Sequence, residues 1–289
     1  MTKSSLTVFV TLVGGCATKT TTTTGASSAC LGDVSHSSLA GYTQDFVRDV
    51  ADSAYIIRVH VTALHATTVP NTTATASDVI AQVDAVAFHD AEIDSLLGNW
   101  GAGATVTIDL ATANVAVDDE VYFFTTLEEF NGGQLAVREL GRAQPAHAYD
   151  TAIAKMRAML DANPLYTAIA TSVAVVSTDV SALGSVDTGC GSEHCPMWQP
   201  ASFGAVTALC GDPLDGASFA SSEDIAWSSA PKLVVGQAGV FLVHRPEDEA
   251  AAFATLGGSP QRTLARAIDV HADADEAEIE ALLASPPTF

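Results

Sequence analysis

The chain has 289 residues, of which 48% are hydrophobic and 16% are charged. Its 34 acidic residues outnumber its 12 basic residues, which gives a formal net charge of −22 at pH 7. Because phosphate backbones and anionic lipid headgroups are bound by clustered cations, this composition argues against nucleic acid and lipid headgroups as partners. The length allows one large domain or two modules of roughly 110 to 130 residues each.

Residues 1–15 have the features of an export signal. Lys3 precedes an apolar run over 6–13 that is too short to span a bilayer. The motif Val13-Gly14-Gly15-Cys16 resembles the lipobox of bacterial lipoproteins. The resemblance implies that the signal is removed, that the thiol of Cys16 carries lipid, and that acyl chains anchor the exported protein to a membrane of the cell envelope. The alternative is an ordinary cleaved signal followed by an incidental cysteine.

Residues 16–29 are predicted to form a flexible tether between the lipid and the folded body. They are rich in threonine and small residues, which have almost nothing to bury. In some Gram-negative lipoproteins an aspartate after the lipidated cysteine retains the protein at the inner membrane. Ala17 stands at that position here, so the resemblance implies the outer membrane.

The first module, residues 30–149, is predicted to be rich in β-strands. Apolar residues at helical spacing over 42–52 predict a short helix before the first strand. Alternating apolar residues then predict five strands, at 55–64, 78–88, 104–110, 120–127 and 134–140. The turn Asn131-Gly132-Gly133 predicts a hairpin between the last two strands, because Asn-Gly between apolar runs is typical of a tight turn.

The second module, residues 150–289, is predicted to begin and end with a helix. Asp150 is the expected N-cap of a helix over 151–162, which stops before Pro164. Asp273 is the expected N-cap of the C-terminal helix.

The stretch between these helices repeats the pattern of the first module. Residues 166–176 align in their alternation with 54–64, and 225–243 align without a gap with 106–124. This similarity indicates an internal duplication. The predicted fold class is therefore mainly β with short helices (α+β), built as two tandem, related, small antiparallel β-barrels of the OB type or as sandwiches.

The order of elements, with a helix, two long strands, a turn, a strand and a terminal apolar strand such as 239–244, resembles the OB-type barrels of netrin-like and tissue-inhibitor-of-metalloprotease-like domains. The likeness covers 42–140 and 151–246. It implies protease inhibition as one candidate function. In the inhibitor family a free amino-terminal cysteine and a nearby Cys-x-Cys motif reach the protease metal, whereas here Cys16 is predicted to be lipidated and Cys30 has no such neighbour.

Once Cys16 is assigned to lipid, four cysteines remain, and an even number in an exported chain predicts disulfides. If 166–180 and 200–210 pair as a hairpin, the 181–199 loop lies about 33 Å from the other end of the hairpin, because ten strand residues span that distance. A disulfide is too short to bridge it. The predicted pairs are therefore Cys190–Cys195 in the loop and Cys30–Cys210 at the other end.

Three segments carry side chains that metals use. One holds Cys190, His194 and Cys195, whose sulfur and imidazole groups suit zinc or copper. A second holds His60, His65 and His89, in or beside the first two strands. The third places Asp269, His271, Asp273, Asp275 and Glu280 at positions used by calcium loops, but Ala274 replaces the glycine that such a loop requires. No metal site and no cofactor are predicted, because disulfides, exposed sheet residues and a helix start account for these patterns.

No glycine-flanked serine elbow, His-Glu-x-x-His motif or phosphate loop occurs in the sequence, so no catalytic residues are assigned. The anchor, the β-rich scaffold and the missing motifs favour an envelope lipoprotein that acts as a non-enzymatic binding or interaction module. Its partners are expected to be the membrane, through the lipid anchor, and a protein or small molecule. The alternatives are an envelope hydrolase with a dispersed active site, a zinc- or copper-binding envelope protein and a protease inhibitor.

Overall fold

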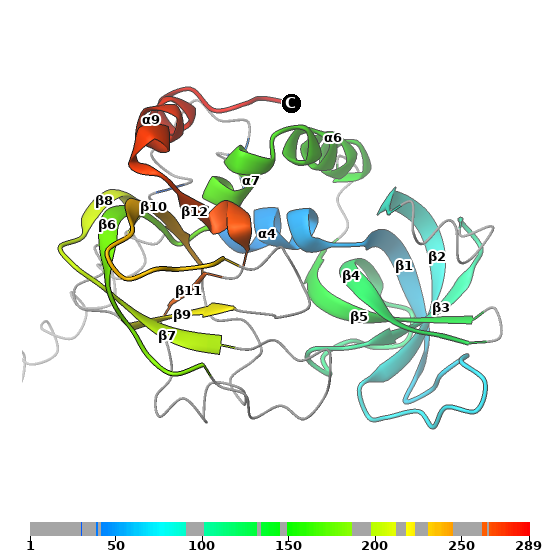
Figure 1. Cartoon of the computed structure of the whole chain (residues 1–289). Helices are drawn as coiled ribbons and strands as arrows, with labels where there is room; N and C mark the ends of the chain where they lie inside the picture. Colours follow the sequence, from blue (N-terminus) through cyan, green and yellow to red (C-terminus); the bar gives the residue numbers. More distant parts are fainter. Residues whose placement is uncertain are drawn as a thin grey trace, which may run out of the picture. The chain divides into compact units, whose positions relative to one another are not determined.

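The computed structural model describes most of the chain from residue 42 onward (Figure 1). The described residues are 30, 39, 42–90, 101–131, 134–144, 149–186, 198–211, 218–222, 231–244, 262–264 and 266–289. The predictions for the signal, Cys16, the tether and the loop with Cys190, His194 and Cys195 lie outside these residues. Within the described ranges, no helix is long and apolar enough to cross a membrane.

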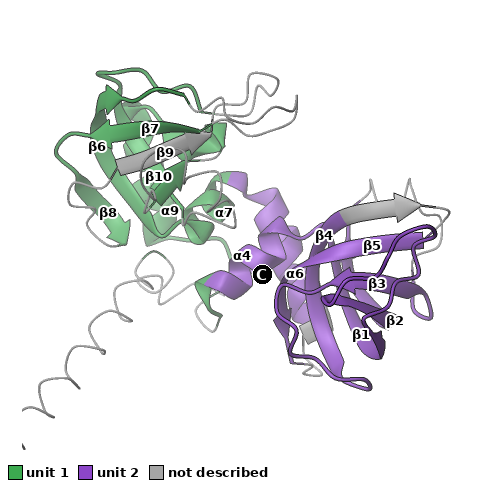
Figure 2. Cartoon of the chain, turned by 90° about the horizontal axis from the view of Figure 1, so that it is seen from below, with its two compact units in different colours: residues 1–44, 165–288 green, residues 45–164, 289 purple. Residues whose placement is uncertain are grey.

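The described chain forms two compact units (Figure 2). The first in sequence, called the barrel unit, comprises Asp45–Pro164. The other, called the sheet unit, comprises Leu165–Thr288 and the described residues up to Gln44. Both units are mainly β with a few short helices, which confirms the predicted secondary-structure class.

The barrel unit contains a closed barrel of five strands. They are β1 (Tyr55–Leu64), β2 (Asp78–His89), β3 (Thr105–Asp109), β4 (Glu120–Asn131) and β5 (Gln134–Ala143). Around the barrel they follow the order β1-β2-β3-β5-β4, and β4 pairs back onto β1. Neighbouring strands are antiparallel except β3 and β5, which are parallel. All five strands predicted for the first module are confirmed, and Asn131 pairs with Gln134 across the predicted hairpin.

Alternation along each strand decides which side chains enter the barrel. On β1, Tyr55, Ile57 and Val59 are fully buried in the core. On β3, Val106 and Ile108 enter the same core, so Thr107 between them faces outward. Each large apolar side chain that is fully buried stabilises the barrel by roughly 1.5–3 kcal/mol.

Two helices accompany the barrel, α4 (Gln44–Asp52) before β1 and α6 (Tyr149–Ala162) after β5. Phe46 of α4 packs edge-to-face on Phe124 of β4, with ring centroids 5.2 Å apart. Arg157 of α6 closes the C-terminal end of α4, because its Nη1 donates to the carbonyls of Val50, Ala51 and Ser53 at 2.7–2.9 Å. The predicted helix positions are confirmed, although α6 begins at Tyr149, so Asp150 lies inside the helix instead of capping it.

The sheet unit holds shorter elements around one sheet. Its strands are β6 (Ala174–Leu183), β7 (Trp198–Phe203), β8 (Thr207–Gly211), β9 (Ser218–Ser222), β10 (Ala238–Val243), β11 (Arg262–Leu264) and β12 (Val270–His271). Its helices are α7 (Pro164–Thr171) and α9 (Glu276–Ala284), with 3-10 turns η2 (Ala267–Asp269) and η3 (Asp273–Asp275). The strand order is β11-β9-β7-β6-β10-β12, with β8 paired to β6, and only β9 and β11 run parallel.

Both faces of this sheet are covered. On one face, Ile169 of α7 and Ile279 of α9 pack against Val240 and Leu242 of β10. The Cys30–Cys210 disulfide lies in that same layer, so the predicted pairing is present. On the other face, a second apolar cluster contains Val176, Phe241 and Leu264.

The strand order of the sheet unit parallels that of the barrel. Read from β5, the barrel order is β5-β3-β2-β1-β4, and the sheet order is β11-β9-β7-β6-β10, with a parallel first pair in each. β7 and β8 together occupy the place of β2, because β6 pairs with β7 through its second half and with β8 through its first.

The predicted second barrel is nevertheless wrong, because the described strands of the sheet unit form an open sheet. In the barrel, β4 and β5 pair over most of their twelve and ten residues. In the sheet unit, β11 has three residues, and the corresponding contact is a single antiparallel bridge between His244 and Thr263. Too little strand is present to close the sheet by pairing.

Two local predictions in the sheet unit are also wrong. The strand expected at 166–176 starts at Ala174, and the residues before it form α7. Pro164 favours a helix start, because its fixed φ suits the first helical position, and an apolar run of this length reads equally as a buried strand or helix. Asp273 does not cap the C-terminal helix but begins η3, and α9 starts at Glu276.

Candidate functional site

The barrel unit carries a polar pocket on its outer face. The loop over residues 65–77, which joins β1 to β2 and is light blue in Figure 1, folds back over β2, β3 and β5. The space between loop and barrel has a volume of about 200 Å³. We call it the hydroxyl pocket; its lining residues are Thr67, Thr72, Thr73, Thr75, Ser77, Asp78, Thr107, Asp109 and Ala136.

Thr107 holds the loop against the barrel. Its side chain is fully buried on the outer face of β3. Thr107 Oγ1 accepts a hydrogen bond from the backbone N–H of Thr68 at 2.8 Å. The same oxygen lies 3.0 Å from Thr68 Oγ1 and 3.3 Å from Thr67 Oγ1. A buried hydroxyl with several partners fixes both the loop and the floor of the pocket.

Two carboxylates stand side by side in the pocket. Asp78 of β2 and Asp109 of β3 are direct cross-strand partners, so their side chains share the outer face. Asp78 Oδ2 accepts from the backbone N–H of Thr75 at 2.6 Å, and Asp109 Oδ1 accepts from Ser77 Oγ at 2.5 Å. Arg138 Nε lies 4.0 Å from Asp109 Oδ2 and is itself largely exposed. The two carboxylates give the pocket a negative lining.

This lining is suited to recognition by hydrogen bonds. Serine and threonine hydroxyls both donate and accept, and a carboxylate offers about four lone-pair positions, of which the contacts above use only some. Among the described lining residues there is no histidine, cysteine or lysine to act as a nucleophile or as a base at neutral pH. The arrangement therefore offers hydrogen-bonding groups to a polar ligand.

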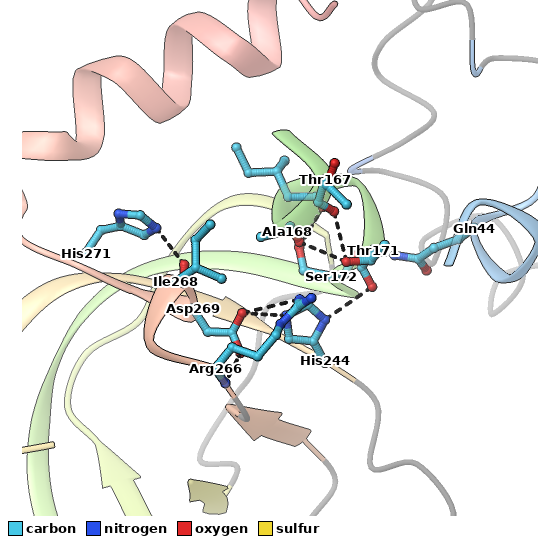
Figure 3. Close-up of polar contacts among 11 residues, drawn as sticks. Gln44, Thr167, Ala168, Thr171, Ser172, His244, Arg266, Ile268, Asp269 and His271 are labelled. Atoms are coloured by element: carbon cyan, nitrogen blue, oxygen red, sulfur yellow. Dashed lines mark hydrogen bonds and ion pairs between the residues drawn. The ribbon is translucent and has the colours of Figure 1, made fainter. Parts of the chain in front are cut away.

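The sheet unit contains a second polar cluster, beside the bridge between His244 and Thr263 (Figure 3). Asp269 of η2 is completely buried, and its Oδ1 lies 3.0 Å from His244 Nε2. Arg266 donates its backbone N–H to Asp269 Oδ2 at 2.8 Å. Its Nη2 lies 3.5 Å from Asp269 Oδ1 and 3.2 Å from His244 Nε2. The other ring nitrogen of His244, Nδ1, lies 3.3 Å from the carbonyl oxygen of Thr171.

Burial by itself raises the pKa of Asp269, but its hydrogen bond and electrostatic interaction with His244 and the charge of Arg266 outweigh it. The pKa of this carboxyl therefore lies below its ordinary value, and the group is ionised in the folded protein at neutral pH. We name the set of Thr171, His244, Arg266 and Asp269 the Asp269 cluster.

The Asp269 cluster contains an acid–imidazole pair but lacks the arrangement of a catalytic triad. In a triad, one ring nitrogen faces the acid and the other faces a nucleophile. Here Nδ1 faces the carbonyl oxygen of Thr171. A carbonyl oxygen can accept a hydrogen bond but has no proton to give up. The cluster is therefore a structural link between the end of β10, the start of η2 and the end of α7.

The three histidines in or beside the first two strands have separate partners or positions. His60 Nδ1 lies 3.0 Å from Asp84 Oδ1, and His65 Nδ1 lies 2.8 Å from the carbonyl oxygen of Ala76. His89 is opposite Tyr55, at the far end of β1 from His65. In the described part of the chain, no three histidine, cysteine or acidic side chains are grouped to hold a metal.

The calcium-like segment near the C-terminus is taken up by other contacts. Asp269 faces His244, and Asp275 Oδ2 accepts from the backbone N–H of Ala272 at 3.1 Å. His271 Nε2 lies 2.7 Å from the carbonyl oxygen of Ile268 (Figure 3). Of the tryptophans, Trp198 is buried at the start of β7, while Trp100 and Trp227 lie outside the described residues.

The sequence analysis missed both the hydroxyl pocket and the Asp269 cluster. One signal for the pocket was available, because five threonines fall within the loop, at Thr67, Thr68, Thr72, Thr73 and Thr75. No comparable signal marks the cluster, since His244 and Asp269 are separated by a long connection.

No protein-family model matches the chain, and a search of curated proteins finds no match.

Proposed function

We propose that this chain is an exported lipoprotein, anchored through Cys16 to the bacterial cell envelope, that binds a small polar ligand in the hydroxyl pocket without transforming it. The observation that carries the proposal is the fixed lining of that pocket. Its side chains are held by hydrogen bonds to one another and to the loop, so little ordering remains to be done when a ligand enters. The lipobox-like motif and the acidic, cation-poor surface support the anchor through acyl chains.

We also propose that the barrel is of the OB type. Support comes from its strand order, β1-β2-β3-β5-β4, and from the single parallel pair β3–β5. A helix before β1 and another after β5 strengthen the likeness to netrin-like domains. OB barrels bind ligands with the outer face of strands two and three and the loop between strands one and two. The hydroxyl pocket lies in that region, under the loop over residues 65–77.

The binding proposal is tested with the full chain, expressed with its own signal and purified in detergent. Thermal unfolding is measured with a library of small polar molecules, including sugars, amino acids, polyamines and sugar phosphates. A ligand at 100 times its dissociation constant stabilises the fold by about 2.7 kcal/mol, which is visible as a raised Tm. Ala136→Leu fills the pocket and is expected to abolish the rise.

Thr62→Leu is the matched control, because Thr62 is an exposed residue of β1 outside the pocket. A library member that raises the Tm equally in both variants binds elsewhere and contradicts the proposal. The anchor is tested separately by intact mass and membrane fractionation, and Cys16→Ser is expected to release the protein from the membrane fraction.

A further inference from the structure

We propose that the hydroxyl pocket accepts a neutral, hydroxyl-rich ligand of about one sugar ring, such as a monosaccharide residue or a linear polyol. The inference rests on the proposed binding function and names its ligand class. It follows from the size of the pocket, the charge of its lining and the kinds of hydrogen bond that the lining can make.

Size limits the ligand to a small group. A volume of about 200 Å³ is near that of a single hexose ring and well below the roughly 300–1,000 Å³ of sites for drug-sized ligands. The apolar part of the lining is made of Ala136 and the carbon atoms of the threonine, serine and aspartate side chains, which can contact the C–H groups of a ring.

The charge of the lining excludes anions. Asp78 and Asp109 face the same space from neighbouring strands, and the described lining residues include no lysine or arginine. Arg138 lies 4.0 Å from Asp109, but its side chain is 59% exposed, so solvent screens it. A uronate or a sugar phosphate would meet two carboxylates without a compensating cation.

A metal cation also fits poorly. Calcium takes six to eight oxygen ligands, whereas one oxygen of each carboxylate is already bound to Thr75 or Ser77. No group of three acidic, histidine or cysteine side chains occurs among the described residues here. A ligand hydroxyl needs fewer protein oxygens than a calcium ion does, because it can donate to one remaining carboxylate lone pair and accept from one threonine hydroxyl.

The rim is shaped by a strained turn. Asn71 has φ of 65°, in the left-handed region that asparagine tolerates better than most residues. The turn leads into Thr72 and Thr73, whose exposed side chains stand at the mouth of the pocket. The hydroxyls of Thr72 and Thr73 at the mouth and the carboxylates of Asp78 and Asp109 thus offer donors and acceptors to a ligand.

Saturation-transfer NMR on the full chain in detergent tests the ligand class. The probes are neutral hexoses, N-acetylhexosamines and ribitol, compared with glucuronate, glucose 6-phosphate and spermidine. Calcium has no protons to observe, so its binding is measured by the shift in Tm. At least one neutral probe is expected to bind saturably. Asp109→Asn, which keeps the shape but removes the charge, is expected to weaken that binding at least 10-fold, and Ala136→Leu is expected to abolish it.

Asp84→Asn is the matched control, because Asp84 lies on β2 but contacts His60 outside the pocket. It is expected to leave the affinity unchanged. Thermal melts show whether each variant is folded. If Asp109→Asn does not fold, Ala136→Leu provides an independent test of the inference.

Binding of spermidine, calcium or the anionic probes alone overturns the ligand class but leaves the proposed binding function standing. Absence of binding by every probe overturns the ligand class, and absence of any Tm rise across the wider library overturns the binding function as well. Neutral-sugar binding that survives Ala136→Leu places the site elsewhere and also contradicts the inference.

Discussion

The carboxylate of Asp269 lies 3.0 Å from Nε2 of His244, at the place where the sheet of the second unit meets the three-residue strand β11. His244 bonds to Thr263 through its backbone, at 2.9 and 3.0 Å, and to Asp269 through its side chain. A hydrogen bond between a buried carboxylate and an imidazole thus reinforces a contact that consists of a single residue pair. In the barrel the corresponding strands, β4 and β5, are joined along most of their length.

Asp269→Asn is expected to destabilise the sheet unit by about 1–3 kcal/mol, because it weakens a buried hydrogen bond with His244 and removes the charge that faces Arg266. The pKa of Asp269 is lowered in the folded state, so its contribution is fully present above the ordinary aspartate pKa of about 3.9 and is lost as the pH falls through the folded-state value. Urea unfolding between pH 7 and pH 2.5 is the measurement. The stability gap between wild type and variant should close in the acid range, and a gap that stays constant would contradict an ionised Asp269.

Arg157→Ala is expected to destabilise the barrel unit by about 3 kcal/mol. The change removes three hydrogen bonds to the end of α4 and a cation–π contact with Phe88, where the guanidinium carbon lies 4.1 Å from the ring centroid. Arg157→Lys should recover part of the loss, since one ammonium group cannot copy the planar guanidinium. Thermal unfolding measures both variants. Arg138→Ala, at a largely exposed ion pair, serves as the comparison and should cost about 1 kcal/mol or less.

Replacing Cys30 and Cys210 together by alanine is expected to cost about 2–5 kcal/mol, because the disulfide joins residues separated by 180 positions and restricts the unfolded chain. Denaturant unfolding without reductant measures the loss. The double replacement of Cys190 and Cys195, only a few residues apart, is the matched comparison and should cost less. Equal losses from the two pairs would count against the long-range constraint as the cause.

Gly239→Ala is expected to destabilise the sheet unit by about 1–3 kcal/mol or to detach β12. A Cβ at this position would lie 2.0 Å from the carbonyl oxygen of His271, so the backbone of β12 has to move. Gly101→Ala provides the control, because its Cβ would meet no atom within 4 Å. Hydrogen exchange at Val240 and Phe241 reports the detachment directly, and protection equal to that of wild type would show that the contact is unimportant.

The barrel strands could be predicted because each has one face in the core and one outside. On β1, Val59 and Val61 enter the core and alternate with the less buried Arg58 and His60, and this period of two is visible in the sequence. The stretch from Leu165 to Val176 has no such contrast, since most of its residues are buried on every side. Its helix and strand could not be separated by periodicity, and the predicted repeat was therefore aligned incorrectly there.

With α7 and β6 at their observed positions, the order of helices and strands in the two units corresponds more closely than the predicted alignment did. Helix α7 and strand β6 follow one another as α4 and β1 do, and β1 and β6 are both ten-residue strands that begin with three buried residues. An internal duplication remains a prediction, now with a consistent alignment of these elements.

The candidate sites depend on information that a single sequence does not contain. The hydroxyl pocket requires the loop over residues 65–77 to fold back onto β3, and that path is set by the bonds between Thr68 and Thr107. The Asp269 cluster requires the register that ends β10 at His244. Neither register nor loop path is encoded in local propensity.

The Cys30–Cys210 bond closes a covalent ring that contains the whole barrel unit, from Asp45 to Pro164. A protease cut at one site within the barrel unit therefore leaves a single molecule, which separates into fragments only after reduction. Mechanical tension also bypasses the barrel unit. A pull on the chain ahead of Cys30 passes across the sulfur bridge into β8, and the barrel carries none of the load.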